Sequence, residues 1–132
     1  MRFVDTNVFI YHITAHKKFG EAAKKILQRI EDGEQAITSM VVLQEVAWVL
    51  EAMGEQNKIK ETLEKIFSYK TLDVKGIDEK NLIQGCHYMN SHHVDFNDGV
   101  NISVMRAHDV SEVYSNDQKH LGKVEFLDIV FE

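Results

Sequence analysis

The chain has 132 residues, of which 44% are hydrophobic, and a formal net charge of −6. This length predicts one globular domain over residues 1–132, with little room for a second hydrophobic core. A charged fraction of 27% without long blocks of one sign argues against a disordered chain. The negative charge disfavours a protein that binds nucleic acid by ion pairing alone, unless bound cations offset some of the acids.

The sequence contains no membrane-spanning or secretory signal. No apolar stretch reaches the roughly 18 residues that a spanning helix needs, and an acid at position 5 interrupts the only apolar run near the start. The single cysteine, Cys86, excludes an internal disulfide. We therefore expect a cytoplasmic protein without a membrane segment.

Short apolar runs alternate with segments of helical periodicity. A buried strand is predicted at residues 2–4, with a short helix directly after it. Helical spacing predicts the other helices, at residues 19–30, 40–53, 57–69, 79–89 and 97–107. Apolar runs predict the other strands, at residues 36–38, 71–74, 112–115 and 124–127. Strands separated by helices run parallel, so the pattern predicts a three-layer α/β/α sandwich with a central parallel sheet of four to five strands.

Several residues mark the ends of these helices. Ser39 and Asp78 are of the types that cap helix N-termini, and Gly33 and Gly54 of the type that follows a helix C-terminus. Residues 90–93 are predicted to be a loop between the last two helices.

Two acids follow predicted strands. Asp5 comes after the first strand and precedes Thr6 and Asn7, and Asp117 ends the run Tyr114-Ser115-Asn116-Asp117. In an open parallel sheet, ligands bind beyond the carboxyl ends of the strands, so both acids are placed for chemistry. The simpler interpretation of Asp5 is a helix N-cap, a role that Asp and Asn fill well. The two interpretations differ in whether other acids converge on Asp5.

Glu45 lies within an apolar stripe of its predicted helix. Its neighbours three and four positions away on either side are all apolar, namely Val41, Val42, Trp48 and Val49. Burying an unpaired carboxylate costs several kcal/mol, so this position predicts a partner for Glu45. The alternative is a glutamate at the margin of the stripe whose carboxylate reaches water.

Asp98 lies in the first turn of the predicted helix at 97–107. An acid there complements the helix dipole, which is an alternative to a role in a site. Asp95, just before it, is interpreted as an N-cap or a residue at the rim of the site.

The predicted fold allows four acids to meet in one groove, because two of them end strands and two lie on flanking helices. Clustered carboxylates repel one another and cannot all stay ionised without a cation among them. Oxygen ligands alone favour Mg²⁺ or Mn²⁺ over zinc. The four predicted catalytic and metal residues are Asp5, Glu45, Asp98 and Asp117.

The chain resembles the PIN domains, a family of metal-dependent ribonucleases that includes the toxin subunits of VapBC toxin–antitoxin systems. The resemblance spans the whole chain and rests on Val4-Asp5-Thr6-Asn7, Glu45, Asp95-Phe96-Asn97-Asp98 and Tyr114-Ser115-Asn116-Asp117. The resemblance implies that the four acids hold the metal and that polar supporting positions surround them, at Thr6, Asn7 and Ser115.

The resemblance also implies a mechanism and partners. Metal ions held by the acids would activate water for attack on an RNA phosphodiester, in single-stranded or looped RNA. Asp5 and Asp98 are then expected to be direct ligands, Glu45 to bind metal or orient the water, and Asp117 to act through water. A small antitoxin protein and a homodimer are the expected protein partners.

The chain departs from the family pattern at two positions and lacks an obvious arginine in the groove. Gly99 and Asn101 stand where the family usually has apolar residues, so a loosely formed helix start is expected there. The residues that would bind the substrate in the groove are therefore not identified by the sequence. Lysines in one segment either guide phosphate or form a solvated helix face, the second being the simpler interpretation; they are Lys17, Lys18, Lys24 and Lys25.

Three other interpretations of the sequence are open. A phosphotransferase of the haloacid dehalogenase type also has an aspartate after its first strand but wants a second acid two residues on, where this chain has Asn7. A non-catalytic RNA- or protein-binding module would keep the groove without turnover. A zinc site matches no standard spacing, and the simpler interpretation is a core thiol with loop histidines; its residues would be Cys86, His87, His92 and His93.

Overall fold

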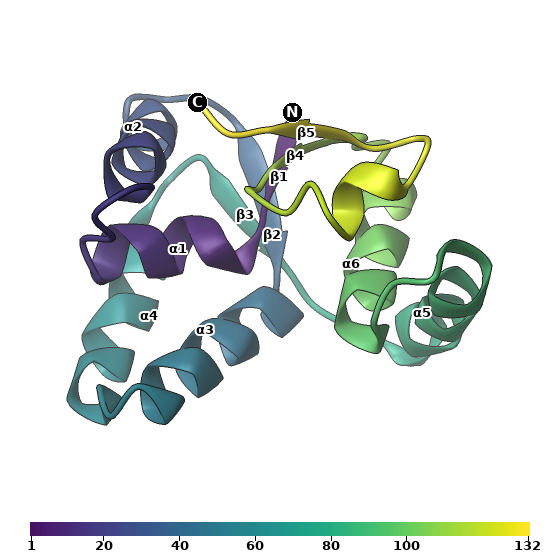
Figure 1. Cartoon of the computed structure of the whole chain (residues 1–132), viewed down its shortest axis with the longest axis horizontal. Coiled ribbons are helices and arrows are strands. Elements are labelled where there is room, and N and C mark those ends of the chain that lie inside the picture. The colour runs from purple at the N-terminus through teal and green to yellow at the C-terminus, as the bar shows by residue number, and fades with distance from the viewer.

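Five short strands form one sheet, in the order β3-β2-β1-β4-β5, and every neighbouring pair is parallel. The computed structural model describes all 132 residues (Figure 1). The strands are β1 (Arg2–Val4), β2 (Ala36–Ser39), β3 (Leu72–Lys75), β4 (Glu112–Tyr114) and β5 (Asp128–Val130). The chain builds outward from β1 to β2 and β3, then returns to the other side of β1 for β4 and β5. The order therefore reverses between β1 and β4, where such sheets open a crevice at the carboxyl ends of their strands.

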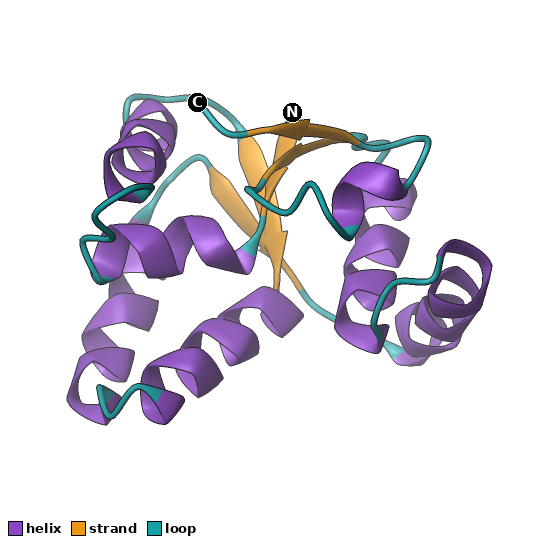
Figure 2. Ribbon diagram, in the orientation of Figure 1, coloured by secondary structure: helices purple, strands orange, loops and turns teal.

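Helices cover both faces of this sheet (Figures 1 and 2). Figure 1 shows α1 to α4 on one side and α5 with α6 on the other, so the predicted three-layer α/β/α sandwich is confirmed. The helices are α1 (Thr6–Ile13), α2 (Gly20–Glu31), α3 (Met40–Ala52), α4 (Ile59–Ser68), α5 (Glu79–His92) and α6 (Phe96–Ala107), with short 3-10 turns η1 (Gln56–Lys58) and η2 (Leu121–Lys123). None of them has the length and apolar character needed to cross a membrane.

The helix ends follow local chemistry. Ser39 accepts a hydrogen bond from the amide of Val42, and Asp78 forms a capping box with Asn81. Gly33 and Gly54 have φ of 120° and 75°, which L side chains rarely adopt. The predicted caps at these four positions are confirmed.

Two predicted boundaries were wrong. Residues 124–127 were expected to be the last strand, but Val124 and Leu127 are buried in consecutive turns and β5 follows them, with Asp128 paired to Glu112. Their apolar character reflects burial beneath a turn rather than strand pairing. Residues 90–92, expected to be loop, continue α5 until His93, which ends the helix with φ 56°.

Helices α5 and α6 pack very closely through two glycines. A Cβ atom at Gly99 would collide with the carbonyl oxygen of Gly85, and one at Gly85 would meet the side chain of Val100 at 2.5 Å. Asn101 is buried and accepts a hydrogen bond of 2.6 Å from the Ser39 hydroxyl, which links α6 to β2. The predicted loose start of this helix is therefore wrong, because Gly99 and Asn101 hold α6 in place.

Candidate active site

Asp5 is buried at the carboxyl end of β1, where it also caps α1. One carboxylate oxygen accepts from the Thr6 amide at 2.8 Å and the other from the Ser115 hydroxyl at 2.7 Å. The pKa of Asp5 is raised to about 6, chiefly by burial and also by the charges of Glu45 and Asp117, while the two hydrogen bonds oppose the rise. Asp5 therefore fills the N-cap role and also experiences the charge of other acids.

Asp98 lies in the first turn of α6, half-buried, and its amide donates to the Asp95 side chain at 2.8 Å. Asp95 is thus the N-cap of this helix, as the sequence predicted. Burial, together with the charges of the surrounding acids, of which that of Asp5 is the largest, raises the pKa of Asp98 to about 8. This carboxyl group faces several like charges.

Glu45 is half-buried on α3 and accepts a hydrogen bond of 3.2 Å from the Asn97 side chain. The expectation that its apolar neighbours form a buried stripe was wrong, because Trp48 is 66% exposed. The core face of α3 instead carries Val42, Leu43, Val46 and Leu50. Glu45 therefore lies on the outer side of that core, at the edge of a cavity.

Ser115 and Asn7 tie the strand ends together. The Ser115 hydroxyl donates to Asp5, accepts from the Asp117 amide at 3.0 Å and accepts from the Asn7 side chain at 3.2 Å. Asn7 in turn accepts from the amide of Asn116 at 3.4 Å. These contacts join the end of β4 to the start of α1 and fix the two acids relative to each other.

A single cavity of about 550 Å³ collects the predicted site residues. Asp5, Glu45, Asp98 and Asp117 all line it, as do Thr6 and Asn7, whereas Ser115 lies behind it and contacts the site through Asp5. Their assignment as catalytic or metal residues stays a prediction. No lysine or arginine lines this acidic cavity.

The donor atoms of the acidic cavity suit a hard divalent cation. They are carboxylate oxygens, and the buried hydroxyl of Thr6 has no hydrogen-bond partner and offers one more oxygen. No three His, Cys, Asp or Glu side chains lie close enough together to form a ready-made ligand cluster. An ion would therefore draw the carboxylates inward or contact some of them through water.

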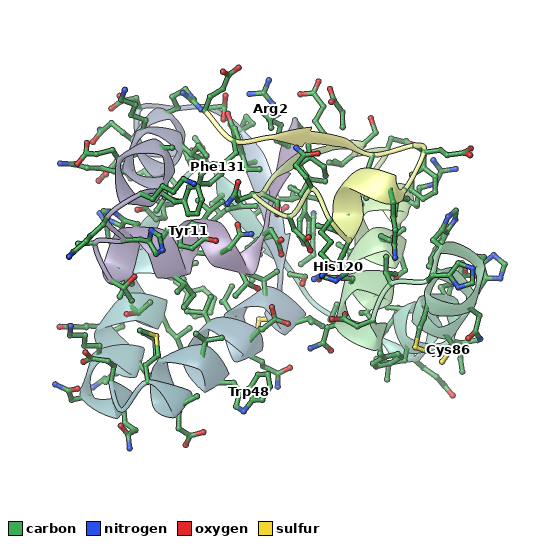
Figure 3. The ribbon with its side chains drawn as sticks, in the orientation of Figure 1. Arg2, Tyr11, Trp48, Cys86, His120 and Phe131 are labelled. Atoms are coloured by element: carbon green, nitrogen blue, oxygen red, sulfur yellow. The ribbon has the colours of Figure 1, made fainter.

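The predicted thiol and histidine interpretation was wrong in its details. Cys86 is exposed on α5 rather than in the core, and His87 and His92 lie on the same helix rather than in a loop. Figure 3 shows Cys86 on α5, at the right-hand edge of the molecule.

Sequence reasoning missed His120. Its ring Nδ1 lies 3.1 Å from an Asp117 carboxylate oxygen, which also accepts from the His120 amide at 2.9 Å. His120 lines the acidic cavity and is its only side chain that can carry positive charge (Figure 3). The spacing of three residues from Asp117, typical of a turn that opens a 3-10 helix, was the available signal.

Comparison with known proteins identifies the class. The sequence model of the PIN domain family matches residues 2–127. The chain therefore belongs to the PIN domain family, as the resemblance predicted. None of the curated proteins compared with it matches.

Solved structures with a similar fold include toxins and toxin–antitoxin complexes. The sarcin–ricin loop cleaving toxin VapC20 of Mycobacterium tuberculosis is 18% identical with a TM-score of 0.80, covering 94% of this chain and 95% of that one. VapBC2 of Rickettsia felis, solved with a DNA fragment from its promoter, is 16% identical with a TM-score of 0.73, covering 98% and 96%. A toxin–antitoxin complex from Klebsiella pneumoniae is 15% identical with a TM-score of 0.70 and the same coverage. At sequence identities of 15–18%, these structural matches show a shared fold.

Proposed function

We propose that this chain is a Mg²⁺- or Mn²⁺-dependent endoribonuclease, acting as a single PIN-like domain over residues 1–132. One observation carries the proposal. Acids from four segments far apart in the sequence line one cavity at the point where the strand order reverses. Like charges are brought together here without a lysine or arginine to offset them, which favours a site for a divalent cation.

Each acid has a distinct role in this proposal. Asp5 and Asp98 hold the metal directly, because burial and neighbouring acids disfavour their ionised forms unless a cation lies beside them. Glu45 holds the metal or orients the attacking water, and Asp117 acts through water. When bound, the metal supplies charge neutralisation for the phosphodiester and an acidified water. Ser115 and Asn7 keep Asp5 and Asp117 in register.

The proposed biological role is that of a toxin in a toxin–antitoxin pair. The fold shared with VapC toxins supports this role, and RNA in single-stranded or looped form is the proposed substrate. The proposed antitoxin segment covers the acidic cavity, where a basic side chain would offset its carboxylates. The proposal places the pair in the cytoplasm, where the exposed thiol of Cys86 stays reduced.

A homodimer is proposed through an apolar groove next to the acidic cavity. This groove of about 540 Å³ is lined mainly by Met40, Val41, Trp48, Ile77, Leu82 and Phe96. Glu45 is its only charged lining residue and also lines the acidic cavity, so a second copy would form a wall of the site. Exposed apolar patches of this kind mark protein interfaces. No lysine or arginine lines the groove, so it is unsuited to binding the phosphates of RNA.

The homodimer is tested with Trp48→Glu in analytical ultracentrifugation. Wild type should sediment as a dimer and the variant as a monomer, because a charge in an apolar interface is costly. Phe67→Glu is the control, since Phe67 is 55% exposed on α4 outside the groove. A dimer that survives Trp48→Glu would remove this interface.

Nuclease activity is tested by Asp98→Asn in a cleavage assay with labelled RNA and Mg²⁺ or Mn²⁺. The variant should lose about 100-fold or more of the rate, because it keeps the side-chain shape but loses a charged ligand. Asp109→Asn is the matched control, since Asp109 is exposed and has φ 55°, which Asn tolerates. Full activity in Asp98→Asn would remove the proposal.

Two alternatives remain distinguishable. A phosphotransferase would form a phospho-aspartate at Asp5, but the position two residues on is Asn7, whose side chain is bound to Ser115. Labelling with a phosphate donor should therefore give no product. A non-catalytic module would bind RNA and metal with no turnover in the same cleavage assay.

A further inference from the structure

The connection between α1 and α2 is tightly built around a strained residue. Ala15 has φ 49°, a left-handed conformation that is unfavourable for a residue with a side chain. The His16 amide donates to the Tyr11 carbonyl at 2.9 Å, and the Gly20 amide donates to the His16 carbonyl at 2.9 Å. A Cβ at Gly20 would come within 3.2 Å of the Ala15 backbone, so the chain closes on itself here. Strain held in this way is typical of functional segments.

This connection forms a second cavity, of about 400 Å³, with a basic lining. The side chains that can carry positive charge there are His12, His16, Lys17 and Lys24, and the only acid is Glu21. Neither Lys17 nor Lys24 forms an ion pair or a hydrogen bond with another side chain. Two lysines in this basic cavity are therefore free to bind an anion.

His16 is fixed in a form that can donate. Its Nδ1 accepts hydrogen bonds of 3.1 Å from the amides of Lys18 and Phe19. With Nδ1 an acceptor, a neutral ring carries its hydrogen on Nε2, which is then a donor. His16 is exposed. Because its neutral ring already carries a donor at Nε2, His16 can bind an anion without being protonated.

Positive charge is concentrated on this side of α1. Burial lowers the pKa of His12, and the charges of Lys24 and Lys65 lower it further. Lys65 lies on α4 and is paired with Glu31, whereas Lys24 is unpaired. With two lysines against one glutamate in its lining, the basic cavity is opposite in charge to the acidic cavity.

Helix α1 connects the two cavities. Ile10 and Tyr11 line the acidic cavity, and the next residue, His12, lines the basic one. The ring centroid of Tyr11 lies 4.8 Å from that of His16, so the two linings are in contact. The eight residues of α1 span about 12 Å, a distance that a few nucleotides cover.

We propose that the basic cavity is a phosphate subsite for the RNA strand whose scissile phosphodiester lies in the acidic cavity. This inference rests on the proposed function and supplies the substrate grip that the acidic cavity lacks. RNA is favoured over an acidic protein segment because the basic cavity adjoins the proposed cleavage site along α1. The lysines noted in the sequence thus divide into two that line the cavity, Lys17 and Lys24, and two that do not, Lys18 and Lys25.

That division provides the test. Binding of a labelled single-stranded oligoribonucleotide is measured by fluorescence anisotropy in EDTA, across a series of salt concentrations. Lys17→Gln/Lys24→Gln should weaken binding and lower the slope of log affinity against log salt by about 1.4, since each lost single-strand phosphate contact removes about 0.7. Lys18→Gln/Lys25→Gln changes the net charge equally and should leave the slope unchanged. In the cleavage assay, the first pair should raise KM without changing kcat.

The possible outcomes separate the two proposals. An unchanged slope in Lys17→Gln/Lys24→Gln, equal slopes in both double variants, or no RNA binding by wild type overturns the phosphate subsite. If the slope is unchanged or equal in both double variants but wild type still cleaves RNA in Mg²⁺, the nuclease proposal stands. A slope change specific to the cavity lysines, with no cleavage under any metal, keeps the subsite and refutes the nuclease. A polyglutamate peptide that binds wild type but not the cavity variant, with RNA binding unaffected, assigns the cavity to an acidic protein segment and overturns the proposal.

Discussion

Acids are treated in opposite ways at two places along β1 and β4. Beside Arg2, Glu112 accepts from the guanidinium at 2.6 Å and Glu34 accepts from the Tyr114 hydroxyl at 2.7 Å. The Tyr114 hydroxyl also accepts from Arg2 at 2.7 Å, so this Arg2 cluster is fully paired. Figure 3 shows Arg2 at one end of the sheet and His120 near the other.

At the carboxyl ends of the same strands, the acids are left without a lysine or arginine. Burial and mutual repulsion raise the pKa values of Asp5 and Asp98 there to about 6 and about 8. The fold can pair acids with a cation, as it does at Arg2, but does not do so in the acidic cavity. This difference supports the proposal that a cation from outside the chain binds in the acidic cavity, whose uncompensated acids lower the stability of the metal-free protein.

The largest expected effect is on catalysis. Asp5→Asn should reduce the rate of RNA cleavage about 100-fold or more. The double variant Asp5→Asn/Asp98→Asn should be no slower than either single variant, because the loss of one ligand of a shared metal already removes the contribution of the other. Arg2→Met should leave the cleavage rate unchanged when measured below its unfolding temperature. Multiplicative losses in the double variant would mean that the two acids act separately.

Metal binding should stabilise the protein next most strongly. A cation that binds only the folded chain adds about 2.7 kcal/mol to the free energy of unfolding at a concentration 100 times its Kd. Thermal unfolding monitored by circular dichroism, with and without Mn²⁺, measures this shift. The shift should disappear in Asp98→Asn and persist in Arg2→Met, and a shift of equal size in Asp98→Asn would place the ion elsewhere.

Without metal, stability should depend on pH through Asp98. Its pKa is raised from 3.8 to about 8, so the folded chain holds more protons than the unfolded chain between these values. The contribution of Asp98 to the free energy of unfolding therefore falls as pH rises through this interval. Asp98→Asn should remove this part of the pH dependence and raise the free energy of unfolding at pH 8 by about 1–2 kcal/mol.

Urea denaturation in EDTA at pH 5 and pH 8 measures that difference. The gap between wild type and Asp98→Asn should be small at pH 5 and widen at pH 8. A variant that is less stable than wild type at both pH values would show that the Asp98 carboxyl group contributes favourable contacts instead.

The smallest effect should come from the paired region. Arg2→Met removes a charge-assisted hydrogen bond to Glu112, but both side chains are partly exposed, so the loss should be about 1 kcal/mol. The sign is opposite to that of Asp98→Asn at pH 8. Urea denaturation of the two variants side by side compares the regions directly, and a gain of stability in Arg2→Met would break the comparison.

The sequence predicted much of this molecule because the relevant signals were local. Asp78 and Ser39 cap helices by contacts within three residues, and Asp5 ends a strand that hydrophobicity alone marks. The layer order followed from strands separated by helices, since parallel strands need crossover connections.

The features that sequence reasoning missed depend on packing between distant segments. Helix α3 has two apolar stripes, and only its neighbours decide that Leu50 is buried while Trp48 is exposed. The close approach of Gly85 and Gly99 brings together residues of two helices and has no local signature. The turns that bury Leu127 delay the start of β5 to Asp128, four residues beyond the start of the apolar run that predicted it.

Whether the acidic cavity binds a cation is the central question about this protein. A crystal soaked in Mn²⁺ and measured near the manganese absorption edge tests this directly. We expect an anomalous peak in the cavity, with carboxylate oxygens of Asp5 and Asp98 about 2.0–2.2 Å from the ion. A cavity without a peak at saturating Mn²⁺, or a peak beside Cys86 and His87 on α5, would contradict it.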